Sequence, residues 1–276
     1  MIFKKRADAN RKNILQISRD QVLDALKKIP EKDFIDGQYD LEASSQLKKI
    51  IFILSTPRCG STLLSGLFYR NGFCLPHEYF QKFQYMPILA DRWGCINDEV
   101  LDKQAYLDNL IKKRTSPKGW LGINLHGEHL ATFSHFENLM PEVEMQFIHL
   151  MRQDPIAQAV SYELATQTGQ WSSHFSQTGN ACYTFSGIKK RLAMINEQNA
   201  IIRTYLKSRK LDHEILYYED LLENPVAKLK ELLPDLPLEG LNIESALKRQ
   251  SSAINNEWIE RFSSEYYEAN AEGRST

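Results

Sequence analysis

The stretch Ile50-Ile-Phe-Ile-Leu-Ser-Thr-Pro-Arg-Cys-Gly-Ser-Thr-Leu-Leu64 decides the fold of this chain. Its first five residues, Ile50–Leu54, are apolar and predict a buried strand. A turn with Gly60 follows, and Ser61 then opens a helix that we expect to run to about Arg70. The first backbone N–H groups of a helix lack intrahelical partners, and the helix dipole is positive there. The junction therefore predicts a site for a phosphate or sulfate group.

The order of residues in this turn narrows the ligand. A loop that grips a nucleoside triphosphate has two glycines and a Lys directly before its Ser or Thr. Here the turn has one glycine, no Lys precedes Ser61, and the cation is Arg58. The order Pro-Arg-x-Gly-Ser-Thr-Leu resembles the loop of sulfotransferases that use 3′-phosphoadenosine-5′-phosphosulfate (PAPS), in particular the bacterial trehalose 2-sulfotransferase type of carbohydrate sulfotransferase. An ordinary strand-to-helix turn with a capping Ser is the structural alternative.

The resemblance implies that this turn holds the 5′-phosphosulfate end of PAPS. Arg58 would offset the charge on the leaving phosphate, and backbone N–H groups would hold the phosphate oxygens. No metal is required, because fixed cations and N–H dipoles can carry the charge. The expected donor-binding residues of the turn are Pro57, Arg58, Cys59, Gly60, Ser61 and Thr62.

The composition is that of an ordinary folded protein. The chain has 276 residues, of which 42% are hydrophobic and 25% charged. Its net charge of −1 argues against broad nucleic-acid or membrane-surface binding. The cysteines form no CxxC pair, so zinc is not indicated, and they are compatible with a reducing cytoplasm. The charged N-terminus and the lack of a long apolar run predict neither a standard signal peptide nor a transmembrane segment.

Strand and helix patterns alternate along the chain. Segments 121–125, 145–150 and 214–218 predict further strands. Helices are expected from Pro155, over 188–209, and over 221–233 with Pro225 near the first turn. This alternation predicts an α/β fold, a P-loop-like three-layer arrangement with a central parallel sheet flanked by helices. Ligands of such sheets bind at the carboxyl ends of the strands.

Residues 1–48 precede the first strand and predict a helical appendage, while residues 49–276 form the expected sulfotransferase domain. Within the appendage Ile14, Ile17, Val22, Leu23 and Leu26 fall at roughly helical spacings. The appendage would pack on the body of the protein or on the second subunit of a homodimer.

A second anion site is expected where the strand 145–150 ends. Arg152 follows this strand, and Ser161 lies about two turns into the next helix. Arg offers a planar fork of donors suited to phosphate oxygens. The resemblance implies that Arg152 and Ser161 hold the 3′-phosphate of PAPS. The alternative is a surface Arg with a buried helical Ser.

Two later segments also resemble the PAPS sulfotransferases. Tyr217–Pro225 resembles the family's strand-to-helix junction, which implies that Tyr218 lies beside the adenine. Aromatic stacking on a base is physically reasonable. The segment from 247 to 262 resembles the family's closing loop, with Arg249 as the second cation on the 3′-phosphate and Lys248 as the competing choice.

The expected general base is Glu78, in the segment Pro76-His-Glu-Tyr-Phe80. The resemblance implies this role, since the trehalose type has a Pro-x-Glu-Phe/Tyr-Phe motif whose Glu is the base. A carboxylate in a partly dry cleft has a raised pKa and can take the proton of an attacking hydroxyl. The neighbouring His77 is the rival candidate. The expected catalytic residues are therefore Glu78 and Arg58.

The acceptor side departs from the relatives. Cys74-Leu-Pro76 replaces a Gly-Glu-Pro, and Asn124 replaces a Lys, which puts trehalose in doubt and leaves a carbohydrate or glycolipid hydroxyl as the expected acceptor. His126-Gly-Glu-His129 lacks further metal ligands at suitable spacing, so we expect it to line the acceptor cleft and expect no metal. The predicted acceptor contacts are His77, Phe80, His126 and Trp171.

These patterns together predict a PAPS-dependent sulfotransferase acting by direct in-line transfer. A P-loop nucleotide kinase and a non-catalytic nucleotide-binding protein of the same fold are the alternatives.

Overall fold

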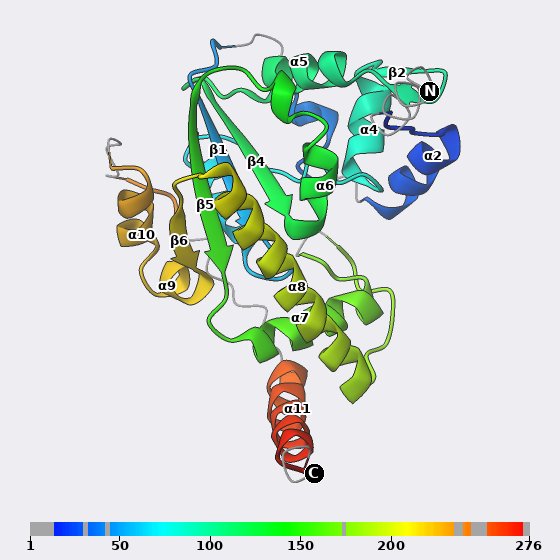
Figure 1. Ribbon diagram of the computed structural model, residues 1–276, viewed down its shortest axis with the longest axis vertical. Helices are drawn as coiled ribbons and strands as arrows, with labels where there is room; N and C mark the ends of the chain where they lie inside the picture. Colours follow the sequence, from blue (N-terminus) through cyan, green and yellow to red (C-terminus); the bar gives the residue numbers. More distant parts are fainter. Residues whose placement is uncertain are drawn as a thin grey trace, which may run out of the picture. The chain divides into compact units, whose positions relative to one another are not determined.

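The sheet predicted from the sequence is present. The computed structural model describes residues 14–29, 33–41, 45–172, 175–234, 240–243 and 253–272. Its central four-stranded parallel sheet has the order β4-β1-β5-β6 and is flanked by helices (Figure 1), which confirms the α/β prediction. The strands are β1 (Lys49–Ser55), β4 (Trp120–His126), β5 (Glu144–Met151) and β6 (Glu214–Tyr217).

The remaining elements follow the predicted alternation. The α-helices are α2 (Arg19–Lys28), α3 (Ser61–Arg70), α4 (Tyr85–Arg92), α5 (Lys103–Arg114), α6 (Leu130–Phe133), α7 (Pro155–Thr168), α8 (Phe185–Arg209), α9 (Tyr218–Glu223), α10 (Pro225–Leu232) and α11 (Ala253–Glu272). The 3-10 helices are η1 (Gly37–Tyr39), η2 (Gly127–His129) and η3 (Glu137–Leu139), and a small antiparallel hairpin joins β2 (Ile96–Asn97) to β3 (Val100–Leu101).

The chain forms two compact units, each made of separate stretches of sequence. Unit 1 comprises Met1–Phe52 and Gly72–Gln146, and unit 2 comprises Ile53–Asn71 and Phe147–Thr276. The division at residue 49 expected from the sequence stays a prediction.

Aromatic side chains fill the core of unit 1. Phe80 contacts Phe133 and Phe136 in edge-to-face geometry, with ring centroids 5.0 and 4.9 Å apart. The Tyr106 hydroxyl donates to the Tyr79 carbonyl at 2.6 Å, so the ring is buried without an unpaired hydroxyl. This core fixes the backbone of residues 79 and 80, directly after Glu78.

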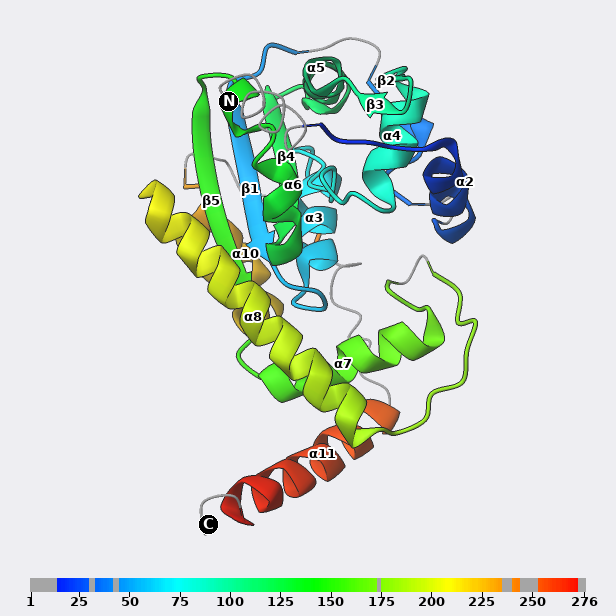
Figure 2. The same cartoon turned by 45° about the vertical axis from the view of Figure 1, so that its right-hand side comes forward.

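The N-terminal helix is shorter than predicted. The expectation of helical structure from Ile14 is wrong, because α2 begins at Arg19, where Ser18 and Gln21 form a capping box. The preceding Leu15–Ile17 stretch is extended instead: Leu101 donates its N–H to the Leu15 carbonyl at 2.9 Å. In Figure 2, α2 lies beside α4 within unit 1.

A buried arginine ties residues 33–41 to α5. The Arg114 side chain is fully buried and contacts the Asp40 carboxylate at 2.6 Å. Its guanidinium also donates to the carbonyls of Phe34 at 2.8 Å and Ile35 at 3.3 Å. A buried charge is tolerated when it is paired and hydrogen-bonded in this way.

Helices dominate unit 2. As predicted, Asp154 caps α7, accepting the Ala157 N–H at 2.8 Å, with Pro155 at the first helical position. Residues of α7 and α8 share a buried cluster with Trp258 and Phe262 of α11. Figure 2 shows α7 and α11 side by side.

The single helix expected over 221–233 is wrong, because two helices stand there. Asn224 ends α9 with φ −141° and ψ 72°, and its side chain accepts the Ala227 N–H at 3.1 Å to cap α10. Pro225 cannot donate to the preceding turn, so it starts a new helix. Tyr218, expected in the strand, is the first residue of α9.

Candidate active site

In unit 2, the turn between β1 and α3 has the backbone of a close-approach site. Arg58 has φ of 66° and Gly60 has φ of 96°, both in the left-handed region. A Cβ on Gly60 would lie 2.3 Å from Cδ2 of Tyr218, so no other residue fits without displacing that ring. Gly60 is also the N-cap of α3 and offers no side-chain oxygen to the first turn.

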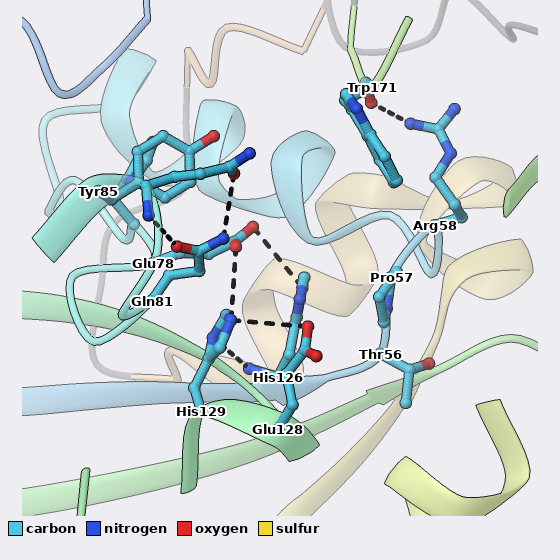
Figure 3. Close-up of polar contacts among 12 residues, drawn as sticks. Thr56, Pro57, Arg58, Glu78, Gln81, Tyr85, His126, Glu128, His129 and Trp171 are labelled. Atoms are coloured by element: carbon cyan, nitrogen blue, oxygen red, sulfur yellow. Dashed lines mark hydrogen bonds and ion pairs between the residues drawn. The ribbon is translucent and has the colours of Figure 1, made fainter. Parts of the chain in front are cut away.

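Arg58 is held by groups from α7 and the segment after it. Its Nε donates to the Ser161 hydroxyl at 3.0 Å, and its Nη1 donates to the Trp171 carbonyl (Figure 3). Burial, and then the nearby Arg152, lower the pKa of Arg58 to about 10. The guanidinium still carries its charge at neutral pH, in a setting that favours an anion.

Arg152 lies against α9. Its Nε is 3.4 Å from the Glu219 carboxylate, and its guanidinium lies 5.1 Å from the centre of the Tyr218 ring. Ser161 therefore accepts a hydrogen bond from Arg58, whereas the resemblance implied that it pairs with Arg152. The roles of Arg152, Ser161 and Tyr218 toward a nucleotide stay predictions.

Gln158 supports the same turn and was missed in the sequence. Its buried side-chain amide donates to the Thr56 hydroxyl and to the Pro57 carbonyl, both at 2.7 Å. It lies one helical turn before Ser161 on α7, so both face the β1–α3 turn. This spacing is the signal that could have identified it.

The other predicted donor residues differ in exposure. Cys59 and Ser61 are buried, and burial raises the pKa of the Cys59 thiol. Thr62 is exposed on the first turn of α3. Arg249 and Lys248 lie outside the described residues.

In unit 1, the segment with Glu78 is fastened to β4. His77 forms a parallel bridge with Ile123, and the Asn124 N–H donates to the His77 carbonyl at 2.9 Å. Gly122 allows this approach: a Cβ there would lie 2.6 Å from Pro76 Cγ.

The Glu78 carboxylate faces two imidazoles. Its Oε1 is 3.7 Å from Nε2 of His126, and its Oε2 is 3.8 Å from Nε2 of His129 (Figure 3). Both histidines are buried, and their rings are stacked with centroids 4.9 Å apart. The Glu78 side chain keeps 22% of its surface exposed.

Burial shifts these groups toward their neutral forms. It raises the pKa of Glu78 to about 7, although the charge of His77 works against the shift and those of Asp33 and Glu128 add to it. It also lowers the pKa of His126 to about 4. Glu78 therefore titrates in the range suited to general-base chemistry.

The rival base His77 is engaged elsewhere. Its Nε2 lies 3.1 Å from the Asp33 carboxylate, which also accepts the Tyr85 hydroxyl at 3.2 Å. Phe80, expected at the acceptor, is fully buried in the aromatic core, so its ring has no surface to offer a ligand. Trp171 is 38% exposed, and its ring packs edge-to-face on Tyr162.

A groove of about 350 Å³ in unit 1 is lined in part by His129, one of the two imidazoles beside Glu78. Phe83, with 67% of its surface exposed, lies on it. The polar and charged side chains that line the groove include Gln81, Lys82, Glu128, His129 and His135.

Three side chains of unit 1 have the spacing of a metal site: Glu78, His126 and His129 offer atoms within 4.8 Å of one another. In the described parts of the chain, no helix is both long and apolar enough to cross a membrane.

Comparison with known proteins agrees with the sequence patterns. A family model described as Stf0 sulphotransferase matches residues 51–265. The chain is 26% identical over 254 residues to a trehalose 2-sulfotransferase of Mycobacterium tuberculosis (strain ATCC 35801 / TMC 107 / Erdman). That alignment covers 77% of this chain and 94% of the relative.

Proposed function

The chain belongs to the Stf0 sulphotransferase family and is a sulfotransferase, and we propose that it transfers a sulfuryl group from PAPS to a hydroxyl of a carbohydrate or glycolipid. The proposal that PAPS is the donor rests on the β1–α3 turn. Gly60, the N-cap of α3, gives the first turn of that helix no side-chain acceptor, and Arg58 keeps a partly buried charge near Arg152. A polyanion such as PAPS fits this combination of a helix N-terminus and guanidinium groups.

Two side chains of the protein have defined roles in the proposed transfer. When bound, PAPS supplies a sulfuryl group joined to a phosphate. Glu78 takes the proton of the acceptor hydroxyl, so that this oxygen can bond to sulfur as the sulfur–oxygen bond to the phosphate breaks. Arg58 offsets the charge left on the phosphate oxygen.

The groove beside His129 supports a hydroxylated acceptor. An exposed aromatic ring, Phe83, and hydrogen-bonding groups such as Gln81 and Glu128 are together suited to a sugar. The substitutions at Cys74–Pro76 and Asn124 leave the identity of that sugar open, and trehalose is one candidate in the panel below.

Nucleotide selectivity tests the donor. At about 100 times its Kd, 3′-phosphoadenosine-5′-phosphate (PAP) should raise the melting temperature by about 5 °C, and ATP or AMP should raise it much less. Equal stabilisation by PAP and ATP, or by neither, would reject PAPS as the donor. Equal stabilisation by PAP and AMP would contradict the proposal that Arg152 and Ser161 bind the 3′-phosphate.

Transfer is tested with radiolabelled PAPS, a panel of glycans, glycolipids and small alcohols, and mass spectrometry of the products. We expect one SO₃ group to be added to a hydroxylated member. PAP binding without transfer to any member would favour the non-catalytic alternative, and Mg²⁺-dependent phosphoryl transfer from ATP would favour the kinase.

A further inference from the structure

The position of one proton in the Glu78 cluster can be worked out from the structure. His129 Nδ1 accepts a hydrogen bond from the backbone N–H of His126, at 3.1 Å. A ring nitrogen that accepts a hydrogen bond carries no proton of its own. If the imidazole is neutral, its proton is therefore on Nε2, the atom that faces Glu78.

His129 is neutral near pH 7. The ring is buried, and burial together with nearby His126 holds its pKa well below the usual range. Its Nε2 is buried without a hydrogen-bond partner, and the Glu78 carboxylate is 3.8 Å away. Glu128 Oε1 is the other carboxylate atom nearby, at 3.9 Å.

We infer that His129 is a positioning residue for Glu78: the His126 backbone fixes its Nε2–H tautomer, and that N–H orients the carboxylate and favours its ionised form. The inference rests on the proposed role of Glu78 as base. The present separation of 3.8 Å is longer than a hydrogen bond, and a shift below 1 Å would form one. Catalytic hydrogen bonds often tighten in this way when the substrate binds.

The same proton argues against a metal at these residues. A histidine that binds a metal through one nitrogen usually donates its other N–H to a carboxylate or carbonyl. In His129 the other nitrogen accepts instead, so Nε2 has no lone pair to give to a metal. The cluster of Glu78, His126 and His129 is therefore better suited to holding a proton than an ion.

Several charged or titratable groups surround Glu78, and the charges of Asp33, His77 and Glu128 act on its pKa. They come from the N-terminal segment, its own loop, α4 and the β4–α6 turn. They are Asp33, His77, Tyr85, His126, Glu128 and His129. Any test must separate the effect of His129 from theirs, which calls for single substitutions at position 129.

Wild-type protein alone provides the first test. Long-range ¹H–¹⁵N NMR spectra of the ¹⁵N-labelled chain distinguish the two neutral tautomers and the imidazolium, and the signal missing in H129Q identifies His129. We expect the neutral Nε2–H tautomer at pH 7. An Nδ1–H tautomer, an imidazolium at pH 7, or a shift of this signal on adding one equivalent of Zn²⁺ would overturn the inference.

Two variants provide the second test, with the Glu78 carboxyl followed by ¹³C NMR. His129→Phe keeps an aromatic ring beside His126 but has no N–H, so the pKa of Glu78 should rise by about one unit. His129→Gln retains an amide donor and should leave the pKa within about 0.3 units of wild type. Equal shifts in both folded variants, or none in His129→Phe, would contradict the inference.

These readouts are independent of sulfuryl transfer, so the inference and the proposed function can fail separately. If the His129→Phe variant does not fold, the tautomer of His129 measured in the wild-type protein still tests the inference. Where transfer is detected, His129→Phe should lower kcat with little change in the KM for PAPS, and His129→Gln should restore most of it. An unchanged kcat in His129→Phe would remove the positioning role.

Discussion

Two regions of the molecule carry the proposed chemistry in different ways. The β1–α3 turn of unit 2 relies on a permanent charge, Arg58, and on a left-handed glycine. The Glu78 cluster of unit 1 relies on side chains whose pKa values are shifted by burial so that their uncharged forms are favoured. The turn is a nearly continuous run of sequence, whereas Glu78 and His129 are about fifty residues apart.

The difference shows which properties depend on tertiary structure. A guanidinium and a helix N-terminus are positive in any surroundings, so the turn attracts anions wherever it forms. The pKa of a carboxylate depends on what covers it. The substitutions below test whether the first region governs donor binding and the second governs proton transfer.

Glu78→Gln should have the largest effect. The amide cannot take a proton, so turnover should fall by about 10²–10⁴-fold while PAP affinity stays within about twofold. Turnover and calorimetric PAP titration on the same preparation check both. Full retained activity would show that the general base is another residue. It would also contradict the proposal that the Glu78 cluster governs proton transfer.

Arg58→Lys should come next. Lys keeps the charge but loses the fork that reaches Ser161 and Trp171, and turnover should fall by about 10²-fold. Arg191→Lys is the control, because Arg191 is also a largely buried arginine of unit 2, paired with Glu163 at 2.8 Å. A similar loss of turnover in both would indicate general damage to unit 2.

Gly60→Ala tests the shape of the turn. The left-handed backbone and the Tyr218 ring both oppose a Cβ, so PAP affinity should fall by about 30-fold, equivalent to about 2 kcal/mol. Gly72→Ala is matched, with φ of 67° and open space around its Cα. It should lower thermal stability slightly and leave PAP affinity unchanged; equal affinity losses would show that strain alone is responsible.

The pH dependence of turnover tests the second region. With a pKa of about 7, Glu78 is half ionised at pH 7, and kcat/KM should fall by about fivefold between pH 7 and 6. An acid limb near pH 4.5, the ordinary value for a Glu, would mean that burial does not act on Glu78 during catalysis.

Stability should depend on pH through the same group, with the opposite trend. The folded chain holds the Glu78 proton up to about pH 7, whereas the unfolded chain releases it near 4.5. The folded state thus binds more protons in this window, and Glu78 lowers stability as pH rises through it. The melting temperature of Glu78→Gln relative to wild type should increase from pH 4.5 to 8, and a constant difference would contradict this.

Phe83→Ala should have the smallest effect. If the groove receives the acceptor, loss of the ring should raise the acceptor KM by about threefold and leave the KM for PAPS unchanged. Tyr267→Ala is the control, since Tyr267 is equally exposed, at 66%, on α11. An unchanged acceptor KM would place the acceptor elsewhere.

Local patterns explain what the sequence predicted well. The strand at 50–54, the α3 start at Ser61 and the Asp154-Pro155 cap depend on neighbouring residues, and all three are confirmed. The break at Asn224 was missed because a proline in a first turn is compatible with one helix or two. Ile14 and Ile17 match a helical spacing, but pairing with the β3 edge overrides it.

Tertiary contacts explain what the sequence could not predict. Glu78 was expected as a base from its motif, whereas its two imidazole neighbours depend on how β4 passes the 76–80 segment. Phe80 was expected to face the acceptor, and the aromatic core covers it. Homodimer formation and a cytoplasmic location stay predictions.

The Arg114 contacts also constrain the order in which the chain can fold as it is synthesised. Arg114 reaches Asp40 across 74 residues, and the intervening stretch includes Ile53–Asn71 of the other unit. Domains generally fold as units, beginning with the N-terminal one during synthesis. Unit 1 cannot complete its interior until Phe133, Phe136 and the residues up to Gln146 leave the ribosome, and unit 2 must wait for α11. We therefore expect the early nascent chain to keep apolar surface exposed until these later segments have been synthesised.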